Sequence, residues 1–193
     1  MLGLKLATYP RWVNIAEKTI EEILVDHAFC EQKAATTGIS LIVRFSNYPN
    51  IVEKVTPVVA EEWGHFRKVL KELQSRGYHL GKPRKDNYVI ELQKGTKKGG
   101  SINYQIVEAL LVCAMIEARS CERFRLLSLH VADEHLKQFY HEFMISEAGH
   151  YRMFIELAQE FADKSYVKKR WNEFLEYEAE LMTRIEYRGD RVH

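Results

Sequence analysis

Two short stretches, Glu61-Glu-Trp-Gly-His65 and Ser146-Glu-Ala-Gly-His150, decide the fold that this sequence predicts. Each contains the motif Glu-x-x-His, and each follows a further glutamate upstream in an apolar segment. The same set of ligand-type residues therefore occurs once in each half of the chain: Glu31, Glu62 and His65, then Glu117, Glu147 and His150. A single Glu-x-x-His pair can arise by chance, so the prediction depends on repetition of the whole set.

The spacing within each set is that of metal ligands on helices. Residues i and i+3 share a face of a helix, so the Glu and His of each motif can point at one place. A four-helix bundle holds two carboxylate-bridged irons or manganese ions with one Glu from each of two helices and Glu-x-x-His from each of two others. Mixed oxygen and nitrogen ligation suits Fe(II) or Mn(II), and four carboxylates balance two divalent ions. We therefore expect the six residues to bind two Fe ions, with Mn able to substitute.

Helical periodicity surrounds both sets. A basic, turn-rich crossover separates the two halves at about 77–103, around a short amphipathic piece from Asn87 to Leu92. We expect Tyr48-Pro49-Asn50 to end the first helix, which starts near Pro10 and bends near Gly38. The predicted fold is all-α, a four-helix bundle with a crossover segment and an additional C-terminal helix packed outside the four. The helices expected from the pattern cover residues 10–45, 51–76, 103–129, 132–162 and 165–187.

Composition fits one compact domain. The chain has 193 residues, 46% hydrophobic and 28% charged, so we expect a single domain over residues 1–193 with a sizeable core. A net charge of +1 gives no reason to expect DNA as a partner. Because no apolar run of membrane-spanning length and no signal peptide is present, we expect no membrane partner and a cytoplasmic location. Cys30, Cys113 and Cys121 lack metal or disulfide spacing and are interpreted as buried core residues.

Five segments resemble one known family. They are Asp26-His-Ala-Phe-Cys-Glu-Gln-Lys-Ala-Ala35, Glu61-Glu-Trp-Gly-His-Phe66, Arg76-Gly-Tyr78, Ile116-Glu-Ala-Arg-Ser-Cys-Glu-Arg-Phe124 and Ser146-Glu-Ala-Gly-His-Tyr151. In this order they resemble the ferritin-like tRNA 2-methylthio-N6-isopentenyladenosine hydroxylases, the MiaE family, over nearly the whole chain. The segment around Glu117 is the most distinctive, because general ferritins and rubrerythrins do not usually show it.

The resemblance implies an activity and its partners. It implies a non-haem di-iron monooxygenase that uses O2 and two electrons to hydroxylate the isopentenyl group of a modified adenosine, with the six residues above as ligands. The partners would be the tRNA anticodon loop, O2 and an external electron-donor protein, since no flavin or nicotinamide fingerprint is present. Family members usually carry Arg before each metal His, where this chain has Gly64 and Gly149. The two glycines are explained either by close helix packing or by room for substrate.

Several other residues keep two interpretations. Trp63 and Tyr151 flank ligands and either pack in the core or take redox roles. Basic residues either contact tRNA phosphates or lie on solvated faces, and the candidates are Lys82, Arg84, Lys85, Lys94, Lys97, Lys98, Lys164, Lys168, Lys169 and Arg170. Four residues near Glu117 are expected to form either interhelical ion pairs or hydrogen bonds to the predicted metal ligands His65 and His150. They are Arg119, Cys121, Glu122 and Arg123. Histidines expected at the surface or behind the ligands are His27, His79, His130, His135, His141 and His193.

Two other functions fit the same residues. A ferritin-like protein could oxidise or store iron without an organic substrate, although storage requires a hollow multimer and the long crossover favours a smaller assembly. A di-iron oxygenase could also act on a different substrate, and the residues do not separate this alternative from the tRNA hydroxylase.

Overall fold

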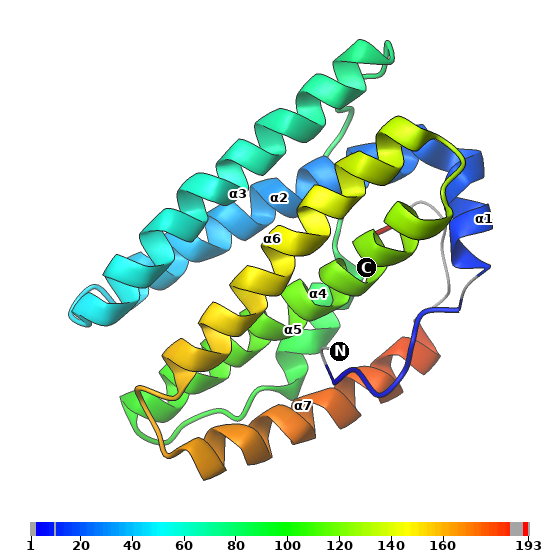
Figure 1. The fold of residues 1–193 in the computed structure, drawn as a ribbon. Helices are drawn as coiled ribbons and strands as arrows, with labels where there is room; N and C mark the ends of the chain where they lie inside the picture. The colour runs from blue at the N-terminus through cyan, green and yellow to red at the C-terminus, as the bar shows by residue number, and fades with distance from the viewer. Residues whose placement is uncertain (1–2, 10, 186–190, 193) are drawn as a thin grey trace. The chain divides into compact units, whose positions relative to one another are not determined.

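The computed structural model describes residues 3–9, 11–185 and 191–192. Across these ranges the regular structure is helical, and none of the described residues forms a strand, as the sequence predicts. The chain divides into two compact units (Figure 1). The first unit is formed by residues 10–85 and 188–192, and the second by residues 1–9, 86–187 and 193.

The first unit is a pair of long helices preceded by a short lead. The lead consists of α1 (Trp12–Ala16) and the 3-10 turn η1 (Glu17–Thr19). It is followed by α2 (Ile20–Arg44) and, after a short connection, by α3 (Pro49–Ser75). The two long helices lie side by side and run in opposite directions (Figure 1). Their apolar faces are buried, so this hairpin supplies a rigid support for the polar side chains that it carries between them.

Two expected boundaries in this unit are wrong. The pattern predicts one helix over residues 10–45, but the structure interrupts it at Thr19, whose φ of −135° and ψ of 43° are not helical; Pro10 lies outside the described residues. The first helix ends at Arg44, close to its expected end at 45, but Pro49, which was expected to terminate it, is the first residue of α3. A proline at this position loses no hydrogen bond, because the first N–H groups of a helix have no partner within it.

The second unit is built around α5 (Ile102–His130). This helix pairs with α6 (Glu134–Ala158), while α7 (Lys164–Arg184) contacts α5 and the short helix α4 (Asn87–Leu92) in the crossover. The turn η2 (Gln93–Gly95) follows α4 directly. The expected helices of this half are confirmed with shifted ends, and the predicted end of the last one at residue 187 lies outside the described residues.

Side-chain caps fix where α5 and α6 begin. Ser101 accepts a hydrogen bond from the backbone N–H of Tyr104, and Asp133 accepts one from the N–H of Leu136 at 3.1 Å. Such caps satisfy donors that the first helical turn leaves open. The two caps therefore stabilise the starts of the helices that carry Glu117 and Glu147.

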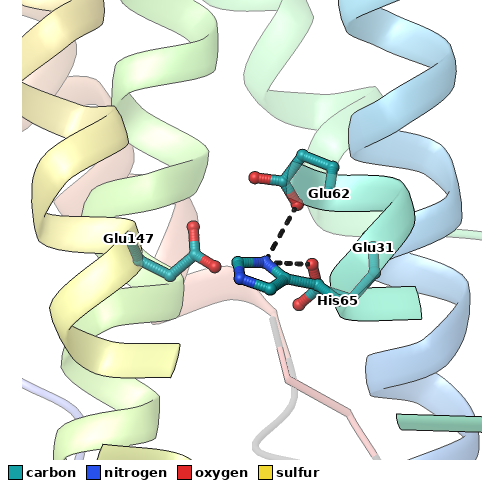
Figure 2. A group of neighbouring side chains, drawn as sticks. All are labelled: Glu31, Glu62, His65 and Glu147. Carbon is teal, nitrogen blue, oxygen red and sulfur yellow. Dashed lines mark ion pairs between the residues drawn. The ribbon is translucent and has the colours of Figure 1, made fainter. Parts of the chain in front are cut away.

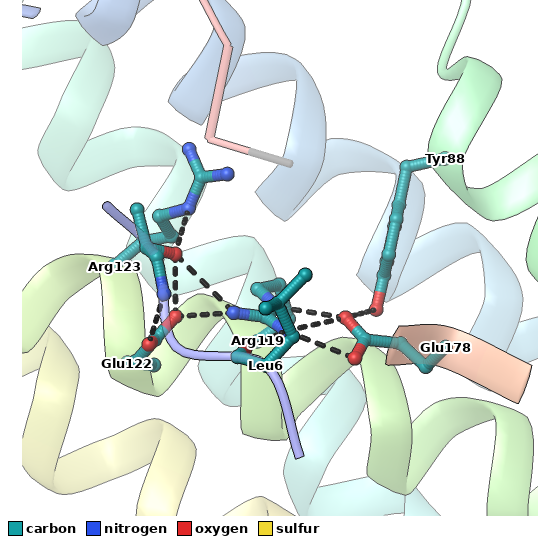
Figure 3. Close-up of polar contacts among 7 residues, drawn as sticks. Leu6, Tyr88, Arg119, Glu122, Arg123 and Glu178 are labelled. Atoms are coloured by element: carbon teal, nitrogen blue, oxygen red, sulfur yellow. Dashed lines mark hydrogen bonds and ion pairs between the residues drawn. The ribbon is translucent and has the colours of Figure 1, made fainter. Parts of the chain in front are cut away.

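Arg119 of α5 is a buried charge that joins three parts of the second unit (Figure 3). Its Nε and Nη2 donate to the carboxylate of Glu178 on α7 at 2.8 and 2.9 Å, and its Nη2 also donates to the carbonyl of Leu6 at 2.9 Å. Its Nη1 pairs with Glu122, which accepts in turn from the hydroxyl of Thr8 at 2.6 Å. Burial lowers the pKa of Arg119, but the charges of Glu178 and Glu122 outweigh it and raise the pKa above its ordinary value. Of the two interpretations open for Arg119, the interhelical ion pair is therefore correct.

We predict that Arg119→Met lowers the free energy of unfolding by about 3–5 kcal/mol, because it leaves the carboxylate of Glu178 buried without its main partner. The double variant Arg119→Met, Glu178→Leu should recover most of the loss, since it removes both charges. Urea unfolding of the wild type, the two single variants and the double variant gives a double-mutant cycle. Additive effects of the two substitutions would contradict the pairing.

Gly38 sets the separation of α2 and α3. A Cβ added to it would lie 2.5 Å from Cγ2 of Val59 and 3.5 Å from Cγ1 of Val55. The helix continues without interruption through Gly38, so the glycine serves close helix packing.

We predict that Gly38→Ala lowers the free energy of unfolding by about 1–3 kcal/mol through overpacking. Gly149→Ala is the matched control, because a Cβ there would meet no atom within 4 Å. It should raise the free energy of unfolding by up to about 1 kcal/mol through helix propensity. The check is chemical denaturation of the metal-free proteins, and stabilisation by both alanines would show that Gly38 is not a packing contact.

Candidate metal centre

The first unit brings together the first set of predicted ligands. Glu31 comes from α2, and Glu62 and His65 come from α3; each offers one ligand atom, and these atoms lie within 4.8 Å of one another. His65 Nδ1 is 3.3 Å from Oε2 of Glu31 and 3.7 Å from Oε2 of Glu62, as Figure 2 shows by dashed lines. Both carboxylates are buried, with residue exposures of 3% and 2%.

His27 supports this group from behind. It lies one helical turn before Glu31 on α2, is fully buried, and its Nε2 is 2.7 Å from Oε1 of that glutamate. One oxygen of Glu31 therefore faces His27 while the other faces His65. A hydrogen bond of this kind fixes the orientation of a ligand carboxylate and is an established means of tuning metal affinity. The i to i+4 spacing from Glu31 was the sequence signal for this role.

The second unit brings together the second set. Glu117 comes from α5, and Glu147 and His150 come from α6, with one ligand atom of each within 4.8 Å of the others. His150 Nδ1 is 3.5 Å from Oε2 of Glu147. All three side chains are buried. Each unit thus contains two buried carboxylates and one imidazole, gathered from two paired helices.

This donor set suits a divalent cation. Two buried carboxylates at such short range repel one another, and isolated ionised carboxylates are costly to remove from water. A bound divalent ion neutralises the pair, and mixed carboxylate and imidazole ligation fits Fe(II) or Mn(II) better than a thiolate-preferring metal. The chemistry of each triplet therefore fits the metal ions expected from the sequence, and both groups are able to bind metal.

Gly64 and Gly149 do not serve helix packing. Both lie in the middle of a helix directly before a predicted ligand, both are exposed, and a Cβ added at either would meet no atom within 4 Å. A glycine in a helix costs about 1 kcal/mol relative to alanine. The packing interpretation is therefore wrong for both residues.

Several basic candidates for RNA contact are engaged inside the protein. Arg170 is buried against Glu108, with Nε 2.6 Å from Oε1, and Lys97 pairs with Glu173 at 2.8 Å. Lys94 pairs with Glu91, and Arg84 pairs with Glu22. By contrast, the α7 lysines Lys164, Lys168 and Lys169 are exposed.

Burial decides between the two interpretations for several of the remaining cysteine, aromatic and histidine candidates. Burial raises the pKa of the Cys113 thiol to about 12 and that of Cys121 to about 11, which confirms these two as inert core residues, while Cys30 is half-buried. Trp63 is about half exposed, so the core interpretation is wrong for it; Tyr151 packs on Trp171.

Arg123 is buried and donates from Nε to the hydroxyl oxygen of Thr8 at 2.8 Å. Several histidines among the described residues are exposed, as the sequence predicts: His79, His130, His135 and His141.

Comparison with known proteins identifies the family. Residues 2–193 match the sequence profile of the family described as tRNA-(MS[2]IO[6]A)-hydroxylase (MiaE). The chain belongs to the MiaE family. It is 34% identical to the tRNA 2-(methylsulfanyl)-N(6)-isopentenyladenosine(37) hydroxylase of Pseudomonas putida over 82% of this chain and 76% of that protein. A protein of the same name from Salmonella typhimurium is 31% identical over 68% of this chain, which spans about half (47%) of the Salmonella protein.

Known structures support the fold. Protein 43 from Synechococcus, which is described as having aldehyde deformylating oxygenase activity, superimposes with a TM-score of 0.92 at 30% identity, over 98% of this MiaE-family chain and 94% of its own. The all-α, ferritin-like fold class predicted from the sequence is thereby confirmed. No helix within the described part of the chain is long and apolar enough to cross a membrane.

We predict that His27→Phe lowers the affinity for Mn(II) by about 10–100-fold, because Glu31 loses the group that orients it. Isothermal titration of the metal-free protein gives the affinity. His141→Phe is the control, since His141 is exposed on α6. Unchanged Mn(II) affinity in a folded His27→Phe protein would remove His27 from the site.

Proposed function

We propose that this protein is a non-haem di-iron monooxygenase that hydroxylates the isopentenyl group of 2-methylthio-N6-isopentenyladenosine in tRNA. The observation that carries the proposal is the match of residues 2–193 to the MiaE family together with two Glu, Glu, His triplets whose carboxylates are all buried. The relatives from Pseudomonas and Salmonella carry the name of this activity. Because its substrate is tRNA, the enzyme would work in the cytoplasm.

The two triplets together form one di-metal centre in this proposal, with the ligands Glu31, Glu62, His65, Glu117, Glu147 and His150. Two observations support it: each triplet has the same composition and the same helical origin, and the family profile spans both units. The two units would then act as one domain over residues 1–193. Neither triplet alone carries enough ligands to hold a pair of bridged ions.

The stoichiometry of the hydroxylation determines which co-reactants the enzyme needs. One O2, two electrons and two protons convert a C–H bond to C–OH and give one water. Bound iron supplies the oxygen and redox chemistry, whereas the protein supplies binding, orientation and a dry site. No flavin or nicotinamide fingerprint is present in the sequence, so we propose that an external protein delivers the electrons.

The residues of the chain have defined tasks in this scheme. The four carboxylates would hold the ions, and the imidazoles of His65 and His150 would each supply one nitrogen. His27 keeps one oxygen of Glu31 directed away from the centre. Burial of the carboxylates excludes water, which protects reactive species from side reactions.

The decisive experiment is an assay with purified, iron-loaded protein. We expect reduced protein, O2, an electron donor and tRNA carrying 2-methylthio-N6-isopentenyladenosine to yield a nucleoside heavier by one oxygen. Glu117→Ala should bind less iron and lose most of the product, because it removes one of the proposed iron ligands. Leu129→Ala, an exposed change on the same helix, is the control. Full iron content and full hydroxylation by Glu117→Ala would refute the ligand assignment.

A second function has one specific observation in its favour. The 30% identity and matching fold of the Synechococcus protein, described as having aldehyde deformylating oxygenase activity, suggest an oxygenase with an aldehyde substrate. Incubation of the same reduced protein with a long-chain aldehyde and O2 distinguishes the two. Release of formate without any change to the tRNA nucleoside would favour the aldehyde substrate. Iron storage, the third alternative, predicts a large hollow multimer in native mass measurement.

A further inference from the structure

One exposed face of α3 combines an aromatic ring, a bare backbone and positive charge. It consists of Trp63, Gly64, Arg67, Lys68 and Lys71, which we call the α3 face. Positions three, four and seven residues apart lie on one side of a helix, so these side chains form a continuous stripe. Of the predicted ligands on the same helix, Glu62 is buried and His65 is half-buried, so the stripe is more exposed to solvent than the ligands are.

Trp63 gives this face a stacking surface. Its side chain is 48% exposed although indole is among the most costly groups to leave in water. It leans on Phe66, with ring centroids 4.9 Å apart and an interplanar angle of 32°, so the ring is supported from one side. An exposed, supported aromatic ring is suited to stacking with a nucleobase.

Gly64 leaves the backbone beside this ring uncovered. Because a Cβ at Gly64 would meet nothing within 4 Å, the structure of the chain itself does not require glycine there. A larger side chain at Gly64 would cover the backbone next to Trp63, where a flat base would lie if it stacked on the indole ring. This room lies on the exposed side of α3, whereas the sequence interpretation placed room for substrate beside the metals.

The C-terminal part of the face is positively charged. Arg67, Lys68 and Lys71 are exposed within two helical turns. The one acidic residue in the sequence between Trp63 and Ser75 is Glu72, which is buried and lies 2.6 Å from Nε of Arg76. Three cations are therefore presented in this part of the face, whereas the exposed carboxylate of Glu61 lies at the other end, before Trp63 and 3.8 Å from Nε2 of His65. An excess of positive charge of this kind suits a surface that meets phosphates.

We infer that the α3 face binds the anticodon stem-loop of tRNA, stacking an unpaired base on Trp63 and holding phosphates with Arg67, Lys68 and Lys71. This inference rests on the proposed function and names the surface on which its substrate docks. Single-stranded loops are recognised by splayed bases stacked on aromatic rings with cations along the backbone, and this face offers both. Because Trp63 lies between Glu62 and His65 in sequence, docking there brings the loop to the helix that carries two of the predicted ligands.

The charge contribution is tested by Arg67→Ala, Lys71→Ala in the iron-loaded full chain, with tRNA affinity measured between 50 and 300 mM salt. Each lost phosphate contact reduces the slope of log K against log salt by about 0.7–0.9, so we expect a reduction of about 1.4–1.8. Lys168→Ala, Lys169→Ala on α7 removes two exposed charges elsewhere and should leave the slope nearly unchanged. Equal slopes for the wild type and the α3 variant would overturn the inference, as would a larger loss in the α7 control.

Stacking is tested separately by Trp63→Ala and Trp63→Phe. We expect Trp63→Ala to weaken binding of the modified stem-loop about tenfold without changing the salt slope, and Trp63→Phe to retain most of the affinity. Circular dichroism and iron content show whether each variant is folded and loaded. Wild-type affinity in a folded Trp63→Ala protein would overturn the stacking role.

The two proposals fail in different ways. If the α3 variants bind tRNA normally and still hydroxylate it, the tRNA docks elsewhere while the proposed function stands. If the variants keep tRNA affinity but accept electrons poorly, the α3 face serves the electron-donor protein and the inference is wrong. If the wild-type protein neither binds nor hydroxylates the modified tRNA, the proposed function is wrong, and the inference about its substrate is wrong with it.

Discussion

The cost of burying carboxylates is the constraint on which this structure depends. Each buried glutamate has to meet positive charge, and the chain meets that need in two ways. Glu108 and Glu178 each meet a buried arginine, and these pairs fasten α7 to α5. The glutamates of the two triplets instead gather beside imidazoles, an arrangement that becomes favourable when a divalent ion is added. The first kind of pairing makes the helices rigid, and the second makes them responsive to metal.

Local patterns were enough to predict the helices and the grouping of the ligands within each unit. Periodicity and helical spacing act over a few residues, which is why the paired Glu and His of each motif were placed together correctly. The metal assignment itself stays a prediction. The break at Thr19 and the role of Pro49 as a helix start were missed, because a proline near a boundary is compatible with either side of it. The partner of Arg119 could not be predicted either, since Glu178 is 59 residues away in sequence.

Burial explains which surface candidates were wrong. Runs of lysine and arginine look alike in sequence whether they face a polyanion or a neighbouring carboxylate, and Arg170 and Lys97 turned out to face carboxylates. Trp63 and Gly64 show the opposite error: a sequence rich in apolar residues made a tryptophan look like core, and the structure leaves it half exposed. An exposed tryptophan and a glycine inside a helix both run against local preference, and such local conflicts are concentrated at functional surfaces.

The anchoring of the N-terminal segment has a consequence for how the chain is made. Thr8 bonds to Glu122 across a separation of 114 residues, and the carbonyl of Leu6 is held by Arg119, which also needs Glu178 near the end of the chain. During synthesis, Leu6 and Thr8 therefore cannot dock until α5, which carries Arg119 and Glu122, has been made, and Arg119 meets Glu178 only when α7 follows. The hairpin of α2 and α3 depends on nearer contacts and can form during synthesis. The segment of Leu6 and Thr8 is thus made before the hairpin but reaches its native place after it, because its partners lie 113 and 114 residues further along the chain.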